Sequence, residues 1–180
     1  MNVKIDISET IIKKERLFLR PWKYTDLQDF NEYASVDGVG QMAGWLPHKS
    51  IDESKEILKD FIEHKKTFAI EYNRKVIGLL GIEEYNEEEF PEFEQKRARE
   101  LGFVLSKDYW GKGLTPEAVN AVIDYLFNEI QLDCIFCGHY TDNEQSKRVQ
   151  EKCGFKHYKL IKSETRYGIV KDAWVSVLTR

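Results

Sequence analysis

Apolar positions recur along the chain with two different spacings. Between residues 116 and 130 they return in pairs about every four positions, which predicts a helix with one wide buried stripe. Short runs such as RLFLR at 16–20, in which apolar residues alternate with polar ones, predict strands. On these patterns we expect helices over 26–34, 51–65, 116–129 and 144–153, and strands over 16–20, 67–72, 75–84, 98–105, 133–140, 155–162 and 173–178.

Residues that favour helix ends stand at the borders of several of these segments. Thr25 and Ser50 are expected as N-caps, and Glu53 stands where the partner of Ser50 in a capping box belongs. Gly154 is expected just past the end of the last helix. Between the first two helices, 35–49 contains three glycines and a proline, which predicts a loop.

The order of elements indicates the fold class. Strands come first and then alternate with helices, which predicts an α/β (α+β) chain with a mixed sheet and helices on both faces. A length of 180 residues with 42% apolar content fits one domain over residues 1–180.

Charge and hydropathy narrow the function classes. The net charge of −4 argues against a dedicated nucleic-acid binder. No apolar run approaches the roughly 20 residues that a bilayer span needs. The first twenty residues mix charges throughout and lack the apolar core of a signal peptide, so we expect a cytoplasmic protein without a membrane partner.

The three cysteines include a C-x-x-C pair, Cys134 and Cys137, within a segment that reads as a strand. Positions i and i+3 of a strand lie about 10 Å apart on opposite faces, too far for a disulfide. A zinc site would need Cys153 and a histidine to converge with the pair. We therefore expect buried thiols and no metal, with redox or zinc chemistry as the alternative.

The segment 83–94 carries seven acidic residues among twelve positions. The simpler interpretation is a solvated connection between strands. The alternative is an acidic lip that attracts a cationic substrate. Together with 38–49, we expect this segment to face the acceptor of any reaction.

The most informative segment is DYWGKGLTPE at 108–117, where a strand ends, two glycines follow and a long helix begins. Gly111 and Gly113 leave the backbone bare, and Pro116 fits the first helical position because its missing N–H costs nothing there. Free amides at a helix N-terminus form an anion site suited to a pyrophosphate. The segment matches neither G-x-x-x-x-G-K-[ST] nor G-x-G-x-x-G. A tight strand-to-helix connection without a ligand is the alternative.

Several sequence motifs occur in an order that is typical of a known family. ELGFVL at 100–105, GKGL at 111–114 and NEQSKRVQEKCGF at 143–155 occur in that order, and ERLFLRPWKYTDLQDF opens the region at 15–30. Over 15–158 the chain resembles the GNAT superfamily of acyl-CoA N-acetyltransferases. Within it, the chain is most similar to the branch of RimJ/RimL-type ribosomal-protein N-terminal acetyltransferases. The resemblance implies a mostly antiparallel central sheet with one splayed parallel strand pair.

The resemblance also implies a binding site for acetyl-CoA. The family's pyrophosphate motif, R/Q-x-x-G-x-G/A, aligns with Gly113 as its first glycine; this puts Trp110, which is common in this branch, where Arg or Gln is usual, and leaves Thr115 as a departure. Pro116 departs too and removes one candidate amide. Asn143 is implied as a pantetheine contact, with a simple helix N-cap as the alternative. The implied cofactor-binding residues are Phe103, Val104, Leu105, Trp110, Gly111, Lys112, Gly113, Leu114, Thr115 and Asn143.

Acetyl transfer requires a base for the amine and a donor for the departing thiolate. The resemblance implies Glu100 as the base, and the alternative is a carboxylate paired with Arg97 or Arg99. Ser146, on the helix of the last motif, is the candidate donor, and Tyr140 is a further possibility.

Two further groups complete the expected site. A backbone amide near Val104 or Leu105 is expected to stabilise the oxyanion. A covalent acetyl-cysteine on Cys153 is the less economical route, because apolar packing explains a thiol just before Gly154.

The leading hypothesis is an acyltransferase that moves acetyl from acetyl-CoA to a primary amine by direct attack in a ternary complex. By resemblance the acceptor is a protein N-terminus, such as that of a ribosomal protein. A polyamine, an aminoglycoside or a small metabolite amine stays open, as does a catalytically silent CoA-binding domain. The sequence leaves monomer and homodimer open.

Overall fold

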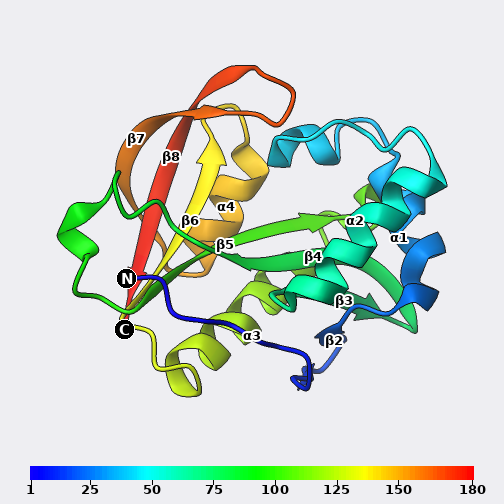
Figure 1. Cartoon of the computed structure of the whole chain (residues 1–180), viewed down its shortest axis with the longest axis horizontal. Helices are drawn as coiled ribbons and strands as arrows, with labels where there is room; N and C mark the ends of the chain where they lie inside the picture. Colours follow the sequence, from blue (N-terminus) through cyan, green and yellow to red (C-terminus); the bar gives the residue numbers. More distant parts are fainter.

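A computed structural model describes residues 1–180. Its centre is one eight-stranded sheet in the order β1-β2-β3-β4-β5-β6-β8-β7 (Figure 1). Only β5 and β6 run parallel, and every other neighbouring pair is antiparallel. The expected mixed sheet with one parallel pair is therefore confirmed.

The elements follow the predicted order closely. The strands are β1 Ile12–Lys13, β2 Leu17–Pro21, β3 Thr67–Tyr72, β4 Lys75–Glu83, β5 Ala98–Leu105, β6 Cys134–Tyr140, β7 Lys156–Glu164 and β8 Val170–Thr179. The helices are α1 Leu27–Ala34, α2 Ile51–His64, α3 Leu114–Asn128 and α4 Glu144–Lys152. The two-residue strand β1 was not predicted, because so short a run carries no periodic signal.

Helices cover both faces of the sheet, as expected (Figure 1). On one face α3 and α4 enclose the largest core cluster, which takes in Leu101 and Leu105 from β5. On the other face α1 and α2 pack around Trp22, Phe30 and Leu58. Because successive strand residues point to opposite faces, Glu100, Gly102 and Val104 face the α1–α2 side.

Two helix starts differ from the prediction. A short 3-10 turn over Tyr24–Asp26 precedes α1, and Asp26 rather than Thr25 holds the cap position. The Asp26 carboxylate accepts bonds from the Lys23 amide and the Arg20 guanidinium, a tertiary contact that the local sequence does not show. Helix α3 begins at Leu114, so Pro116 stands third rather than first. No backbone bond is lost, because the first helical amides have no intrahelical partner.

The cap of α2 follows the prediction in one of its two bonds. The Ser50 hydroxyl accepts from the Glu53 amide at 3.1 Å. The Glu53 carboxylate, however, accepts from the Lys49 amide at 2.7 Å instead of closing the box on Ser50. At the other end of the chain, Gly154 follows α4 with φ +87°, as expected of a helix terminator.

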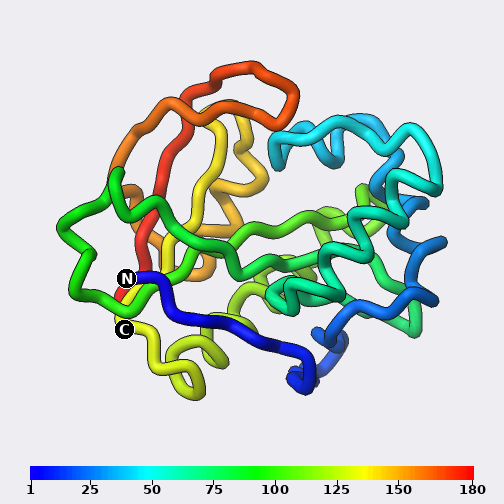
Figure 2. Tube along the Cα trace, in the orientation of Figure 1, coloured from blue at the N-terminus to red at the C-terminus, as the bar shows by residue number.

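The acidic segment 83–94 is a connection that covers the sheet. Its buried Tyr85 and Phe90 pack on Phe136 of β6, with ring centroids 4.6 and 5.2 Å away. Glu89 pairs with Lys159 of β7 at 2.6 Å. The first and last residues of the chain lie together near this connection (Figure 2). No helix is long and apolar enough to cross a membrane.

Candidate active site

The parallel strands β5 and β6 separate partway along their length. Their pairing runs from Ala98 opposite Cys134 to Leu101 opposite Cys137 and then stops. A groove of about 530 Å³ opens beyond that point and takes lining residues from both faces of the sheet. Among them are Met42 from the α1–α2 side and Pro116 and Ser146 from the α3–α4 side.

One end of the groove is the turn between β5 and α3. Gly111 and Gly113 have φ angles of +74° and +73°, which residues other than glycine rarely adopt. The Trp110 indole N–H donates to the Leu105 carbonyl at 2.8 Å and anchors the turn to β5. The Arg16 guanidinium donates to the Lys112 carbonyl at 2.9 Å and holds the turn from the other side.

The backbone of this turn fits an anionic ligand. The N–H groups from Gly111 to Thr115 donate to no other group of the protein. A Cβ atom added at Gly111 would meet nothing within 4 Å, so the turn faces open space. Bare amides together with the positive end of the α3 dipole favour a phosphate or pyrophosphate group.

The backbone N–H groups of Val104 and Leu105, the two expected oxyanion donors, point to opposite sides of β5. Ser106 N donates to the Ile77 carbonyl of β4, and antiparallel bonding alternates along a strand. The N–H of Val104 therefore points toward β4. The N–H groups of Phe103 and Leu105 point to the side from which β6 has separated, so Leu105 is the better placed of the two.

Glu100 lies where the two strands part. Its carboxylate reaches over Gly138 of β6, where an added Cβ would stand 3.2 Å from Oε1. Neither expected arginine partner reaches it: the Arg97 guanidinium donates to backbone carbonyls, and Arg99 bonds the Val3 carbonyl and pairs with Glu84. The ion-pair alternative for Glu100 is therefore wrong.

The surroundings of Glu100 favour its neutral form. Burial raises the pKa of Glu100 to about 7, with a smaller contribution from the carboxylate of Glu83. Glu83 lies opposite on β4 and is itself paired with Lys66. A carboxylate with a pKa near 7 exchanges protons readily at neutral pH, as a general base must.

The start of α4 forms the opposite wall of the groove. Asn143 is the N-cap: its Oδ1 accepts from the Ser146 amide at 3.1 Å, and its Nδ2 donates to the Met42 carbonyl at 3.2 Å. The N-cap alternative is thus observed, and Asn143 also lines the groove. Ser146 lines the groove as well, and its hydroxyl accepts from Gln150 Nε2 at 3.4 Å.

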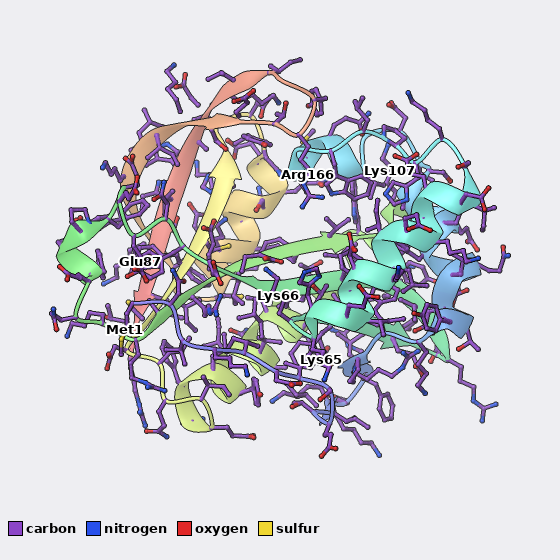
Figure 3. The ribbon with its side chains drawn as sticks, in the orientation of Figure 1. Met1, Lys65, Lys66, Glu87, Lys107 and Arg166 are labelled. Carbon is purple, nitrogen blue, oxygen red and sulfur yellow. The ribbon has the colours of Figure 1, made fainter.

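The loop 35–49 lines the groove on the α1–α2 side. Lys107 Nζ donates to a carbonyl near its start, and Arg166 N, on the hairpin between β7 and β8, donates to the Gly44 carbonyl at 2.8 Å (Figure 3). The loop thus lines the groove as expected, through residues including Met42. The acidic segment 83–94, in contrast, contributes no lining residue, which corrects its expected acceptor-facing role.

The remaining candidate residues, a tyrosine and three cysteines, are buried. Tyr140 lines the groove as well; its hydroxyl lies against Gly44, and burial raises its pKa. Cys134 and Cys137 are buried in clusters on opposite faces of β6, as predicted. Burial raises the pKa of Cys153 to about 11, and its thiol lies 3.8 Å from the Pro116 carbonyl. No group of three or more His, Cys, Asp or Glu side chains is arranged to hold a metal ion.

The structure thus brings almost all predicted site residues to one groove. The exception is Lys112, which does not line the groove. Its ammonium donates to the Asp108 carbonyl at 2.8 Å and lies over the Tyr109 ring. Predicted residues that line the groove are Glu100, Phe103, Val104, Leu105, Trp110, Gly111, Gly113, Leu114, Thr115, Tyr140, Asn143 and Ser146. No local sequence pattern points to Arg16 or Gln150, because their roles depend on contacts between different segments.

Comparison with known proteins agrees with this geometry. Residues 16–156 match the family model described as an acetyltransferase (GNAT) domain. The uncharacterized N-acetyltransferase YoaA of Bacillus subtilis is 29% identical over 153 residues, which cover 81% of this chain and 82% of that protein. A spermidine N(1)-acetyltransferase of Vibrio cholerae is 27% identical over 119 residues, 63% of this chain and 65% of that protein.

Solved structures share the fold. A GNAT-family acetyltransferase from Bacillus anthracis superposes with a TM-score of 0.82 at 22% identity, over 94% of this chain and 98% of that one. The ribosomal-protein-S5-alanine acetyltransferase from Vibrio fischeri gives 0.71 at 23% identity, over 95% and 97%. The family match over residues 16–156 covers most of the chain, and the chain therefore belongs to the GNAT acetyltransferase family as an acyltransferase.

Proposed function

We propose that this acyltransferase moves the acetyl group of acetyl-CoA to the α-amine of a peptide N-terminus, by direct attack in a ternary complex. The observation that carries the proposal is Glu100, an unpaired carboxylate at the strand split. It is the only acidic side chain that lines the groove. Membership of the family specifies neither the acceptor amine nor the chemical route.

The cofactor end of the groove suits acetyl-CoA. The free amides from Gly111 to Thr115 would hold the pyrophosphate. The backbone of Phe103–Leu105, which pairs with β4 on one side and has no strand on its β6 side, and the side chain of Asn143 would hold the pantetheine arm. Bound there, acetyl-CoA supplies a thioester carbonyl that is activated toward an amine.

The protein groups then have separate roles. Glu100 would take the proton of the attacking amine, and the Leu105 N–H, on the open side of β5, would stabilise the thioester oxygen as it becomes negative. As the C–S bond breaks, its electron pair passes to the sulfur, and the Ser146 hydroxyl stabilises the thiolate. The products are the acetylated amine and CoA.

The pKa of the base favours an α-amine over a side-chain amine. Peptide α-ammonium groups have a pKa of about 7.7–8.0, whereas lysine has about 10.4. The pKa of about 7 at Glu100 therefore lies within about one unit of the first and more than three units below the second. A polyamine would also present several cations to a groove whose lining has one carboxylate.

A panel of matched acceptors tests the proposal. One peptide carries a free α-amine and an acetylated lysine, and its partner carries an acetylated α-amine and a free lysine. Spermidine is the third acceptor, and thiol release and product mass are measured at equal concentrations. We expect turnover with the first peptide at least tenfold above the other two. A higher kcat/KM for spermidine would reassign the acceptor to the polyamines, the class on which the Vibrio cholerae relative is named to act.

A further inference from the structure

A buried pair of polar side chains lies between α4 and β6, next to the groove. Gln150 of α4 is 1% exposed and His139 of β6 is 6% exposed. Their neighbours on this face, including Cys153 and Phe155, belong to the largest apolar cluster. Polar side chains buried beside apolar ones are destabilising unless hydrogen bonds satisfy them.

The partners of Gln150 fix which way its amide points. The carbonyl of Gly138 can only accept, so the nitrogen Nε2 must face it, at 3.0 Å. The oxygen Oε1 is then left facing His139 Nδ1 at 3.1 Å, and that nitrogen must carry a proton. Burial lowers the pKa of His139, which favours the neutral ring with its proton on Nδ1.

The same amide nitrogen also sets the Ser146 hydroxyl. Gln150 Nε2 donates its second hydrogen toward Ser146 Oγ at 3.4 Å, so the oxygen is an acceptor in this contact. The hydroxyl hydrogen then has to point elsewhere, and it donates to no group of the protein. Because Ser146 lines the groove, that hydrogen is available to a ligand.

We propose that Gln150, held by Gly138 and His139, is a positioning residue that directs the Ser146 hydroxyl hydrogen toward the sulfur of CoA. The inference rests on the proposed function, because it assumes that the thiol end of CoA reaches Ser146. In acetyl transfer the C–S electron pair ends on sulfur, the amine proton ends on Glu100, and Ser146 donates a hydrogen bond without losing its proton. Gln150 itself touches neither substrate.

Titration of the thiol in bound CoA tests this inference without any acceptor. The ultraviolet absorbance of the thiolate is followed against pH with free CoA and with CoA saturated by protein. The variants are Ser146→Ala, Gln150→Met and the double variant. Glu151→Met is the matched control, because this exposed neighbour on the same helix also becomes methionine and has no side-chain bond in the structure.

A hydrogen bond to a charged acceptor is expected to lower the thiol pKa by about one unit. We expect Ser146→Ala and Gln150→Met each to abolish most of this lowering, the double variant to add nothing, and the control to match wild type. Thermal unfolding confirms that each variant is folded, and Gln150→Leu replaces Gln150→Met if that variant is not.

Two outcomes would overturn the inference, and they are distinguishable. If CoA binds and Gln150→Met or Gln150→Leu titrates like wild type, Gln150 only fills space and the positioning role is lost. If wild-type protein binds no CoA, the proposed function fails first and this inference fails with it.

Discussion

Replacing Glu100 with glutamine should make the enzyme slower and, in alkaline solution, more stable. The substitution keeps the shape of the side chain and removes its basicity. Glu100 has no ion-pair partner to lose, since both nearby arginines bond elsewhere. A general base contributes about 10²–10⁴-fold to a rate, so we expect kcat to fall at least about 100-fold at neutral pH with acetyl-CoA affinity unchanged.

The stability change follows from the raised pKa. The pKa of Glu100 rises from its ordinary value of 4.5 to about 7 in the folded protein. The folded state therefore binds the proton more tightly than the unfolded state does. The resulting stability is fully present below pH 4.5 and is lost as pH rises through 7, by about 3 kcal/mol in total. Glutamine does not titrate, so its variant should escape this loss.

Urea unfolding from pH 5 to pH 9 and a pH–rate profile measure the two effects on the same samples. We expect the stability of Glu100→Gln relative to wild type to increase by about 3 kcal/mol between pH 5 and pH 9. The rising limb of the rate profile near pH 7 should disappear in the variant. A variant with turnover within threefold of wild type would refute the base assignment, and parallel stability curves would refute the raised pKa.

Three further substitutions test other parts of the site. Gly111→Asp places a negative charge against the free amides and should raise the Kd for acetyl-CoA at least tenfold in calorimetry. The control for backbone strain is Gly168→Asp, at an equally open glycine with φ +82°, and this variant should bind acetyl-CoA normally. Ser at both Cys134 and Cys137 should keep kcat within a few-fold but cost about 1–3 kcal/mol per buried hydroxyl in urea unfolding; lost activity on this change would revive the thiol alternative. Gly138→Val should crowd the carboxylate that reaches over this residue and lower kcat while leaving the Kd for acetyl-CoA near wild type, and an unchanged kcat would mean that the carboxylate lies elsewhere during turnover.

Local sequence signals located the elements well where periodicity or a cap determines them. The strand predicted over 98–105 is β5 with the same bounds, and Ser50 caps α2 as expected. The proline signal predicts that α3 starts at Pro116, whereas the helix begins at Leu114, directly after Gly113 with its positive φ. Asp26 replaces Thr25 at the start of α1 because Arg20, on a neighbouring strand, binds its carboxylate.

The site shows the same division. The glycines of the turn could be proposed from residue type within a short motif, and Glu100 could be proposed from the family resemblance. The environment of Glu100 could not, since Glu83 and Gly138 reach it through sheet register. Gln150 and His139 carry no sequence signal, because only the packing of α4 against β6 brings them together.

The strand split also bears on the chemical route. The groove passes between β5 and β6 and is lined from both faces of the sheet, so a cofactor from the α3–α4 side can meet an acceptor from the loop 35–49 side. Direct attack needs that access, whereas a covalent route needs a nucleophile on the protein. Cys153 is a poor one: its pKa of about 11 leaves almost no thiolate at pH 7, and its thiol lies against the Pro116 carbonyl. The carboxylate with a raised pKa at the split and the inert thiol at the end of α4 together favour the proposed direct transfer to the amine.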